Sequence, residues 1–235
     1  MRPIEKKIWK DELGNSIDKE YDPYTEAKDD LIANIGKYCS YCEVPIPPKS
    51  SVAIEHIKPK SLPKYGHLST KWSNFLFSCT NCNAIKGTKD FEFDDLHLPH
   101  KNNTLLSFRL DEGGLLRISP NLSVDEKQKA EKTIWLVGID RRPGDEAYSS
   151  KDDRWQNRFE TWNLAVKYLK KYRTHSVSVD VIVDLALAKG FFTVWLTVFE
   201  SFVEVRKALI HKFEGTATTC FDSSSNAINR NGLGI

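Results

Sequence analysis

The spacing of apolar residues predicts helices on both sides of a long irregular segment. Between Tyr24 and Ile35, Leu31 lies one turn before Ile35, and Gly36 is suited to end the helix. A later stretch repeats apolar residues at intervals of four and three, which predicts an amphipathic helix with one apolar face. That face carries Trp155, Phe159, Trp162, Val166 and Leu169.

A second aromatic pattern predicts another long helix that ends near Gly215. Because its period directs the rings to one side, we expect them in the core rather than on a surface that stacks on bases. Its members are Trp195, Phe199, Phe202, Leu209 and Phe213. Nothing in this half of the sequence indicates catalysis.

Capping and turn signals place the remaining elements. Ser123 and Glu126 form a capping box that opens a helix towards Val137, and Gly138 is expected to close it. Residues 111–114 predict a short hairpin. Residues 1–22 are polar and irregular, which predicts an extended arm. The serine-rich tail from Thr216 is expected to be mobile or to bind a partner.

These patterns divide the chain into three parts. Residues 1–36 form an N-terminal arm and helix. Residues 37–95 hold the candidate chemistry and are loop-rich until a helix begins near Cys79, and residues 96–235 form a mainly helical region with its tail. The predicted fold class is therefore α+β, predominantly helical, and the helical region is the expected surface for docking a partner.

Composition is that of an ordinary globular protein, with 40% hydrophobic and 28% charged residues among 235. The charged start of the chain has no apolar signal segment, and the run from Phe191 to Phe199 is too short to span a membrane. We therefore expect a cytoplasmic protein without membrane contact. Four of the five cysteines lie in Cys-x-x-Cys spacing, which favours a metal over disulfides.

The charge is unevenly distributed, although the net charge of the chain is only +2. Residues 1–36 carry six basic and nine acidic residues, a net charge of −3. Residues 37–89 carry eight lysines against Glu43 and Glu55, a net charge of +6. A basic segment is expected around a phosphodiester substrate, and a solvated lysine-rich surface is the alternative. The lysines are Lys37, Lys49, Lys58, Lys60, Lys64, Lys71, Lys86 and Lys89.

The four paired cysteines predict a structural zinc site. A Cys-x-x-Cys turn offers two thiolates to one ion, and two such turns complete a tetrahedral shell. The pairs are Cys39 with Cys42 and Cys79 with Cys82, separated by 36 residues. This gap exceeds that of a simple zinc ribbon, so a folded insertion must lie between the pairs. The fifth cysteine, Cys220, stands apart in the tail and is given no role.

The insertion and the second cysteine pair carry a recognisable order of residues. Glu55-His56-Ile57-x-Pro59 is followed by Asn74 and then by Cys79-x-x-Cys82-Asn83-x-x-Lys86-Gly87. Together these motifs, within about residues 37–90, resemble the HNH endonuclease family. The resemblance implies a ββα-metal finger, in which two strands precede a helix, and a nuclease activity.

The same resemblance implies a role for each motif residue. His56 would be the general base, Glu55 and Asn83 would give oxygen ligands to a divalent cation, and Asn74 would brace the loop. The sequence departs from the family's letters at Glu55, where Asp is common, and at Asn83, where the last His would stand. Oxygen ligands at both positions favour Mg²⁺ or Mn²⁺. Candidate phosphate contacts are Lys58, Lys60, Lys86 and Lys89, with solvated lysines as the alternative.

Two geometric expectations follow from these roles. Neighbouring residues of a regular strand face opposite ways, so Glu55 and His56 require a strand end or bulge to share a site. Cys82 and Asn83 lie about 100° apart on a helix and can serve different metals. The zinc would then anchor the helix that presents Asn83.

A finer resemblance rests on short motifs that begin at Met1, Gly36, Ile54 and Ser78. Taken together they are similar to the HNH nuclease subunit, PtuB, of Septu-type anti-phage systems, which also accompanies some retrons. In those systems an ABC/SMC-like ATPase partners the nuclease. The resemblance implies such a partner here, docked on the helical C-terminal half and the tail.

Three functions remain open at this point. The favoured hypothesis is a metal-dependent DNA endonuclease that leaves 5′-phosphate and 3′-hydroxyl ends. A second makes RNA, such as a tRNA, the substrate, because the site reads a phosphodiester and not a sugar. A third is a non-catalytic zinc module that binds nucleic acid or a partner and needs only the cysteines and lysines. No small-molecule substrate is expected.

Overall fold

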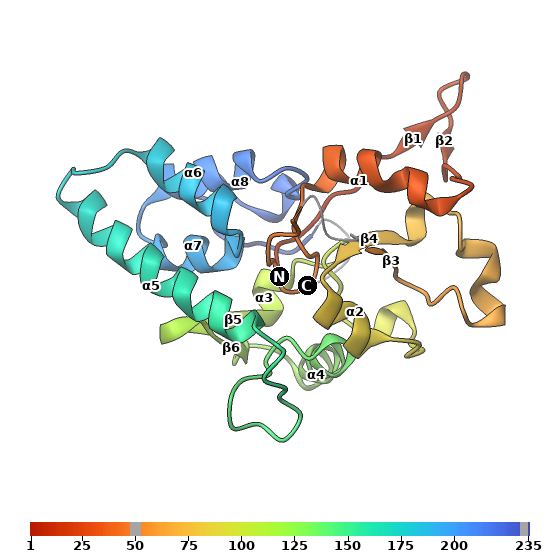
Figure 1. Ribbon diagram of the computed structural model, residues 1–235. Coiled ribbons are helices and arrows are strands. Elements are labelled where there is room, and N and C mark those ends of the chain that lie inside the picture. The colour runs from red at the N-terminus through yellow and green to blue at the C-terminus, as the bar shows by residue number, and fades with distance from the viewer. Residues whose placement is uncertain (48–52, 231–234) are drawn as a thin grey trace.

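The described residues form two hydrophobic cores, and the chain passes from one to the other near residue 139. The computed structural model describes residues 1–47, 53–230 and 235. The first core lies among the N-terminal segment, the finger and residues 96–139, and the second lies among the C-terminal helices. Figure 1 shows the finger on one side of the molecule and the C-terminal helices on the other. Val44, which follows the first cysteine pair, contacts both cores.

The strands described by the structure form three separate antiparallel pairs. They are β1 (Trp9–Lys10) with β2 (Ser16–Ile17), β3 (Ala53–His56) with β4 (Phe75–Ser78), and β5 (Phe108–Asp111) with β6 (Leu115–Ile118). In the central pair, Ala53 lies opposite Ser78 and His56 opposite Phe75. All of β4 is buried, as expected for a strand covered on both faces. The third pair confirms the hairpin predicted at residues 111–114.

The helices confirm most of the capping signals. They are α1 (Ala27–Ile35), α2 (Thr80–Lys86), α3 (Thr104–Ser107), α4 (Val124–Val137), α5 (Arg154–Arg173), α6 (Val179–Lys189), α7 (Phe192–Val198) and α8 (Val203–Lys212). Gly36 ends α1 with φ of 71°. The Ser123 hydroxyl accepts a hydrogen bond from the backbone N–H of Glu126, and Gly138 closes α4 in the left-handed conformation. The expected mixture of helices and small sheets is confirmed.

The long helix predicted across the second aromatic pattern is wrong. The chain forms α7 and α8, with a turn in which the Phe202 N–H donates to the Phe199 carbonyl. Arg206 covers this break by donating to the Glu200 carbonyl. The turn folds α8 back against α6. Trp195 and Phe199 are nonetheless fully buried, because the apolar period records burial and not the continuity of a helix axis.

The buried face of α5 also differs from the predicted face. Trp155 and Phe159 stack on each other with ring centroids 5.4 Å apart, and Phe159 remains 36% exposed. The face turned inward begins instead with Arg154 and Arg158. Their guanidinium groups donate to backbone carbonyls, which allows two arginines to replace aromatics in the interior. Further along α5, Trp162 and Leu169 do contact the second core.

The N-terminal segment packs against the tail, which differs from the predicted extended arm, and the expectation that the tail is mobile or binds a partner stays a prediction. Ile4 pairs with Thr216 in a β-bridge, and the Arg2 side chain donates to the carbonyls of Ile35 and Glu214. The Asn103 side chain holds the tail by donating to the carbonyls of Cys220 and Ile228, both at 2.8 Å. Within the described residues, no helix combines the length and apolar character needed to cross a membrane.

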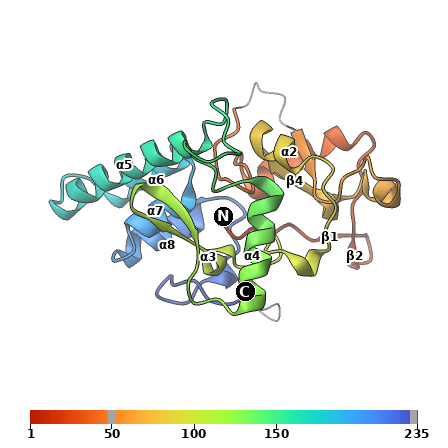
Figure 2. The ribbon, with the colours of Figure 1, turned by 90° about the horizontal axis from the view of Figure 1, so that it is seen from below.

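Helix α4 stands between the finger and the C-terminal helices. Viewed as in Figure 2, α2 and β4 lie on one side of it and α5 to α8 lie on the other. Its residues contact α2 and also β6 and α3. Helix α2, which carries Asn83, therefore packs on α4. Helix α4 lies outside both the cysteine pairs and the β3–β4 strand pair.

Candidate active site and zinc cluster

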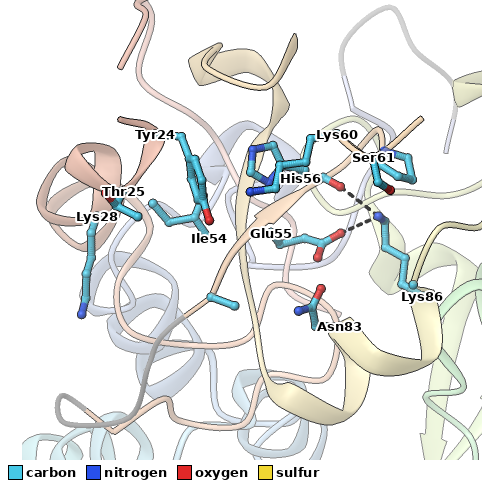
Figure 3. A pocket seen from close by; sticks show the side chains of 13 residues that line it. Tyr24, Thr25, Lys28, Ile54, Glu55, His56, Lys60, Ser61, Asn83 and Lys86 are labelled. Carbon is cyan, nitrogen blue, oxygen red and sulfur yellow. Dashed lines mark hydrogen bonds and ion pairs between the residues drawn. The ribbon is translucent and has the colours of Figure 1, made fainter. Parts of the chain in front are cut away.

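A cavity of about 450 Å³ lies between α1, β3, the loop after β3 and α2. Figure 3 shows the side chains around it. Its walls are Tyr24, Thr25, Lys28, Ala53, Ile54, Glu55, His56, Pro59, Lys60, Ser61, Asn83, Lys86 and Gly87. The structure therefore brings Glu55, His56, Asn83, Lys60 and Lys86 from the sequence motifs to one cavity.

His56 is the last residue of β3, so the chain leaves the strand directly after it. This is the strand-end position expected for the pair, and Glu55 and His56 keep the regular register opposite Leu76 and Phe75. His56 Nε2 lies 2.9 Å from the Ser69 carbonyl oxygen. Because a carbonyl only accepts, Nε2 carries the proton and donates, and Nδ1 keeps its lone pair in the neutral ring.

Aromatic rings and burial hold the His56 imidazole in place and keep it neutral. Its ring meets Tyr24 edge-on at 4.8 Å and Phe75 at 5.2 Å between centroids. Burial lowers the pKa of His56, and the ammonium groups of Lys60 and Lys86 lower it further, while the hydrogen bond to the Ser69 carbonyl opposes this shift. The imidazole is therefore neutral near pH 7, as a proton acceptor must be.

Glu55 is a buried carboxylate whose charge is only partly compensated. Its side chain is 1% exposed, and one oxygen lies 2.7 Å from the Lys86 ammonium. Burial raises the pKa of Glu55 to about 7, although the nearby Lys86 opposes this shift. Asn83 reaches the same place from α2, and its side-chain oxygen points towards the carboxylate (Figure 3). Lys86 only partly offsets the cost of burying the Glu55 carboxylate. The oxygen atoms of Glu55 and Asn83 are therefore suited to bind a hard divalent cation.

Asn74 lies behind the cavity and fastens the loop after β3. Its side-chain oxygen accepts from the Lys58 N–H at 2.7 Å, and its amide donates to the carbonyls of Lys58 and Leu68. The Ile57 N–H donates to the Asn74 carbonyl. Asn74 thus holds the segment that follows His56 against the turn before β4.

The four paired cysteines converge on one point. The four sulfur atoms of Cys39, Cys42, Cys79 and Cys82 all lie within 4.8 Å of one another. The sulfurs of Cys42 and Cys79 are 3.6 Å apart, close to the roughly 3.8 Å expected for two thiolates on one tetrahedral zinc. Burial raises the pKa of Cys42 and of Cys82, so a cation is needed to keep these sulfurs as thiolates. The cluster fits a structural zinc.

Cys82 and Asn83 turn to different sites, as their spacing on a helix predicts. Cys82 is fully buried in the cysteine cluster, whereas Asn83 lines the cavity. Cys79 also caps α2, because its sulfur accepts from the Cys82 N–H. The cysteine cluster therefore fixes both the start of α2 and the residue before Asn83.

The four candidate phosphate lysines have different surroundings in the structure. Lys58 is 3% exposed, and its ammonium lies among the rings of Tyr65, Phe91 and Phe93. An aromatic cage and the Phe91 carbonyl surround its ammonium in this structure, and its phosphate contact stays a prediction.

Lys86, Lys89 and Lys60 have different surroundings. Lys86 is 2% exposed and donates to the His56 carbonyl as well as pairing with Glu55, so its charge is held inside. Lys89 donates to the carbonyls of Trp135 and Leu136 at the end of α4, which is a helix-capping contact. Lys60 is exposed at the cavity rim. Lys49, another lysine of the basic segment, lies outside the described residues.

Sequence motifs missed the wall that α1 and its preceding turn provide. Tyr24, Thr25 and Lys28 line the cavity although they lie outside the motif region. The Lys60 ammonium sits 3.8 Å from the centre of the Tyr24 ring, so this wall connects to the predicted site. No local signal marks these residues, because the contact depends on how α1 packs against the central hairpin.

Comparison with known families agrees with this geometry. Residues 39–89 match the model of the family described as HNH endonuclease. The protein therefore contains an HNH endonuclease domain, which suggests a metal-dependent nuclease that acts on nucleic acid. No curated protein matches the chain.

Proposed function

We propose that this protein is a metal-dependent endonuclease that hydrolyses phosphodiester bonds of nucleic acid, with DNA as the favoured substrate. The observation that carries the proposal is the meeting of Glu55, His56 and Asn83 in one cavity. They come from β3 and α2 of the HNH domain, and in the sequence they lie within the basic segment of residues 37–89. A binding module without catalysis would have no need for this meeting.

His56 takes the proton of the attacking water. Its Nε2 is committed to the Ser69 carbonyl, so Nδ1 is the accepting atom. The lowered pKa keeps that atom unprotonated at neutral pH. Tyr24 and Phe75 restrict the imidazole to the orientation that the Ser69 contact selects.

Glu55 and Asn83 would hold a divalent cation, Mg²⁺ or Mn²⁺. Such an ion supplies charge stabilisation at the phosphate and at the departing 3′-oxygen. Lys86 has a positioning role in this proposal. It contacts the Glu55 carboxylate and the His56 carbonyl at once, and so fixes the two neighbouring residues relative to α2.

Lys60 and Lys28 are the proposed contacts to the nucleic-acid backbone. Lys60 is exposed and Lys28 is half-buried, and both line the cavity on the side of α1. Lysines placed this way attract a polyanion without reading its sequence. They leave DNA and RNA as substrates for experiment to separate.

The anti-phage role and an ABC/SMC-like ATPase partner are further parts of the proposal. Their support is the similarity of short motifs to the PtuB nuclease subunit. The surface over the second core is the proposed docking region, since the cavity lies with the first core. A cytoplasmic location belongs to the same proposal.

The test is cleavage of plasmid DNA and of tRNA by the purified protein with Mg²⁺ or Mn²⁺. Each reaction is run with and without the product of a neighbouring ATPase gene and ATP. Replacement His56→Ala should lower cleavage at least about a hundredfold, because the general base is lost. His67→Ala is the matched control, since His67 is exposed and does not line the cavity. Equal cleavage by wild type and His56→Ala would contradict the proposal, and cleavage of tRNA alone would establish the RNA alternative.

A further inference from the structure

Arg154, the first residue of α5, joins three parts of the protein through one guanidinium group. Its side chain is 3% exposed. It pairs with both oxygens of Asp152, at 2.8 Å and 2.6 Å. It donates to the carbonyls of Val137 and Gly138 at the end of α4, both at 2.8 Å. A fifth contact, 3.1 Å long, runs from Nη1 to the sulfur of Cys82.

These five contacts match the five N–H groups that a guanidinium offers. Asp152 orients the group, and the two carbonyls fix its position on α4. The remaining donor then meets the Cys82 sulfur, which is fully buried. A hydrogen bond from a charged donor to a thiolate is stronger than a neutral one. Arg154 therefore has the geometry of an outer-shell partner of a metal ligand.

The charge of the cysteine cluster explains why such a partner would be needed. Four thiolates around one Zn²⁺ carry a net charge of −2, and an uncompensated buried charge is costly. Arg158 lies one turn further along α5 and is also buried. Both arginines lie beyond residue 89, where the HNH match ends.

We propose that Arg154 is a positioning residue for the zinc-bound Cys82 thiolate, and that α5 is a working part of the metal site. The donated hydrogen bond lowers the nucleophilicity of that sulfur and holds it in the zinc shell. Since Asn83 follows Cys82 on α2, the same contact links the C-terminal helices to the catalytic cavity. This inference rests on zinc binding and does not require that the protein cut nucleic acid.

The test compares wild type with Arg154→Met and Arg154→Lys in the full-length zinc protein. Peptide mapping measures the rate at which iodoacetamide alkylates each cysteine. The colour change of a zinc chelator measures the rate of zinc release. In Arg154→Met, Cys82 should react at least about tenfold faster, because a charge-assisted hydrogen bond is lost. Cys39, Cys42 and Cys79 should change less, and Arg154→Lys should recover part of the protection.

The pattern among the cysteines separates positioning from simple support of the fold. A purely structural arginine would expose all four sulfurs together when it is removed, and this equal rise would overturn the proposal. Wild-type reactivity of Cys82 in a folded Arg154→Met protein would also overturn it. Arg173→Met is the matched control, since Arg173 is an exposed arginine of the same helix.

If Arg154→Met fails to fold, Asp152→Asn gives the second test. Asp152 holds one edge of the guanidinium, through Nε and Nη2, but does not contact the cluster in the described contacts. Weakening it should raise the reactivity of Cys82 in the same direction by a smaller factor. An unchanged Cys82 in that variant would overturn the proposal. Cobalt substitution adds a spectroscopic readout, because the sulfur-to-cobalt absorption should shift in Arg154→Lys and remain unshifted in Arg173→Met.

Discussion

The finger and the C-terminal helices are stabilised in different ways. Within the described residues, the finger has two short strands and one helix of seven residues, and the cysteine cluster joins the segment before β3 to the start of α2. The C-terminal helices bury a continuous set of aromatic and aliphatic side chains around Trp195. The strands of the finger also contribute side chains to the first hydrophobic core, so the finger combines a metal site with packing, whereas the C-terminal helices rely on buried apolar surface. The finger is therefore expected to depend on zinc and the helices on packing.

Removing one zinc ligand should have the largest effect. Cys79→Ser deletes a thiolate from the cluster and the cap of α2 together. Structural zinc contributes on the order of 10 kcal/mol to small zinc modules, so the finger should unfold and zinc content should fall to near zero. Elemental analysis and circular dichroism measure both. Cys220→Ser, which changes a buried cysteine outside the cluster, should keep its zinc.

Removing the central tryptophan of the second core should have the next largest effect. Trp195→Ala leaves a cavity in a fully buried site and should lower the free energy of unfolding by about 3–5 kcal/mol. Urea denaturation measures the loss, and zinc content should stay unchanged before unfolding. Trp135→Ala is the control. Because Trp135 is 51% exposed, it should cost about 1 kcal/mol or less. Loss of zinc from folded Trp195→Ala would contradict the division between the two regions.

Asn74→Ala should affect the loop within the finger. It removes three hydrogen bonds from buried backbone groups and should cost about 1–3 kcal/mol in unfolding free energy. Under the proposed function, cleavage should fall further than substrate binding, because the loop that carries the His56 contacts loosens. Single-turnover rates and binding titrations separate the two. Asn163→Ala, an exposed change on α5, is the control. A stability unchanged in Asn74→Ala would refute the bracing contact.

Phe159→Ala should have the smallest effect on the free energy of unfolding. It tests whether the buried face of α5 is the one that begins with Arg154 and Arg158 rather than the predicted aromatic face. As a core residue on the predicted stripe it would cost about 3–5 kcal/mol. As a half-covered ring stacked on Trp155 it should cost only about 1–2 kcal/mol. Thermal or urea unfolding distinguishes these values. A loss as large as that of Trp195→Ala would restore the predicted stripe.

The contrast also explains which features could be predicted from the sequence. The cysteine pairs, His56 and Asn83 are fixed by short spacings that chemistry requires, and the structure brings them to a cluster and a cavity. Capping at Ser123 and Gly138 is equally local. Local signals of this kind do not depend on the packing of distant elements.

Other features depend on the packing of elements that are distant in the sequence, and the sequence alone could not predict them. The turn between α7 and α8 arises because α8 packs on α6, and the inward arginines of α5 arise from carbonyl groups on other elements. The sequence around Lys58 is typical of an exposed lysine, yet the rings of Tyr65, Phe91 and Phe93 surround its ammonium. Tyr24 reaches His56 only through the position of α1. Each requires the tertiary structure.

Under the proposed function, the cysteine cluster holds the site and His56 performs the hydrolysis. The most direct measurement is zinc content and Mg²⁺-dependent cleavage in the same preparation of His56→Ala. We expect close to one zinc per chain, a wild-type circular dichroism spectrum, and cleavage at least about a hundredfold below wild type. Loss of zinc from this variant, or cleavage at the wild-type rate, would contradict it.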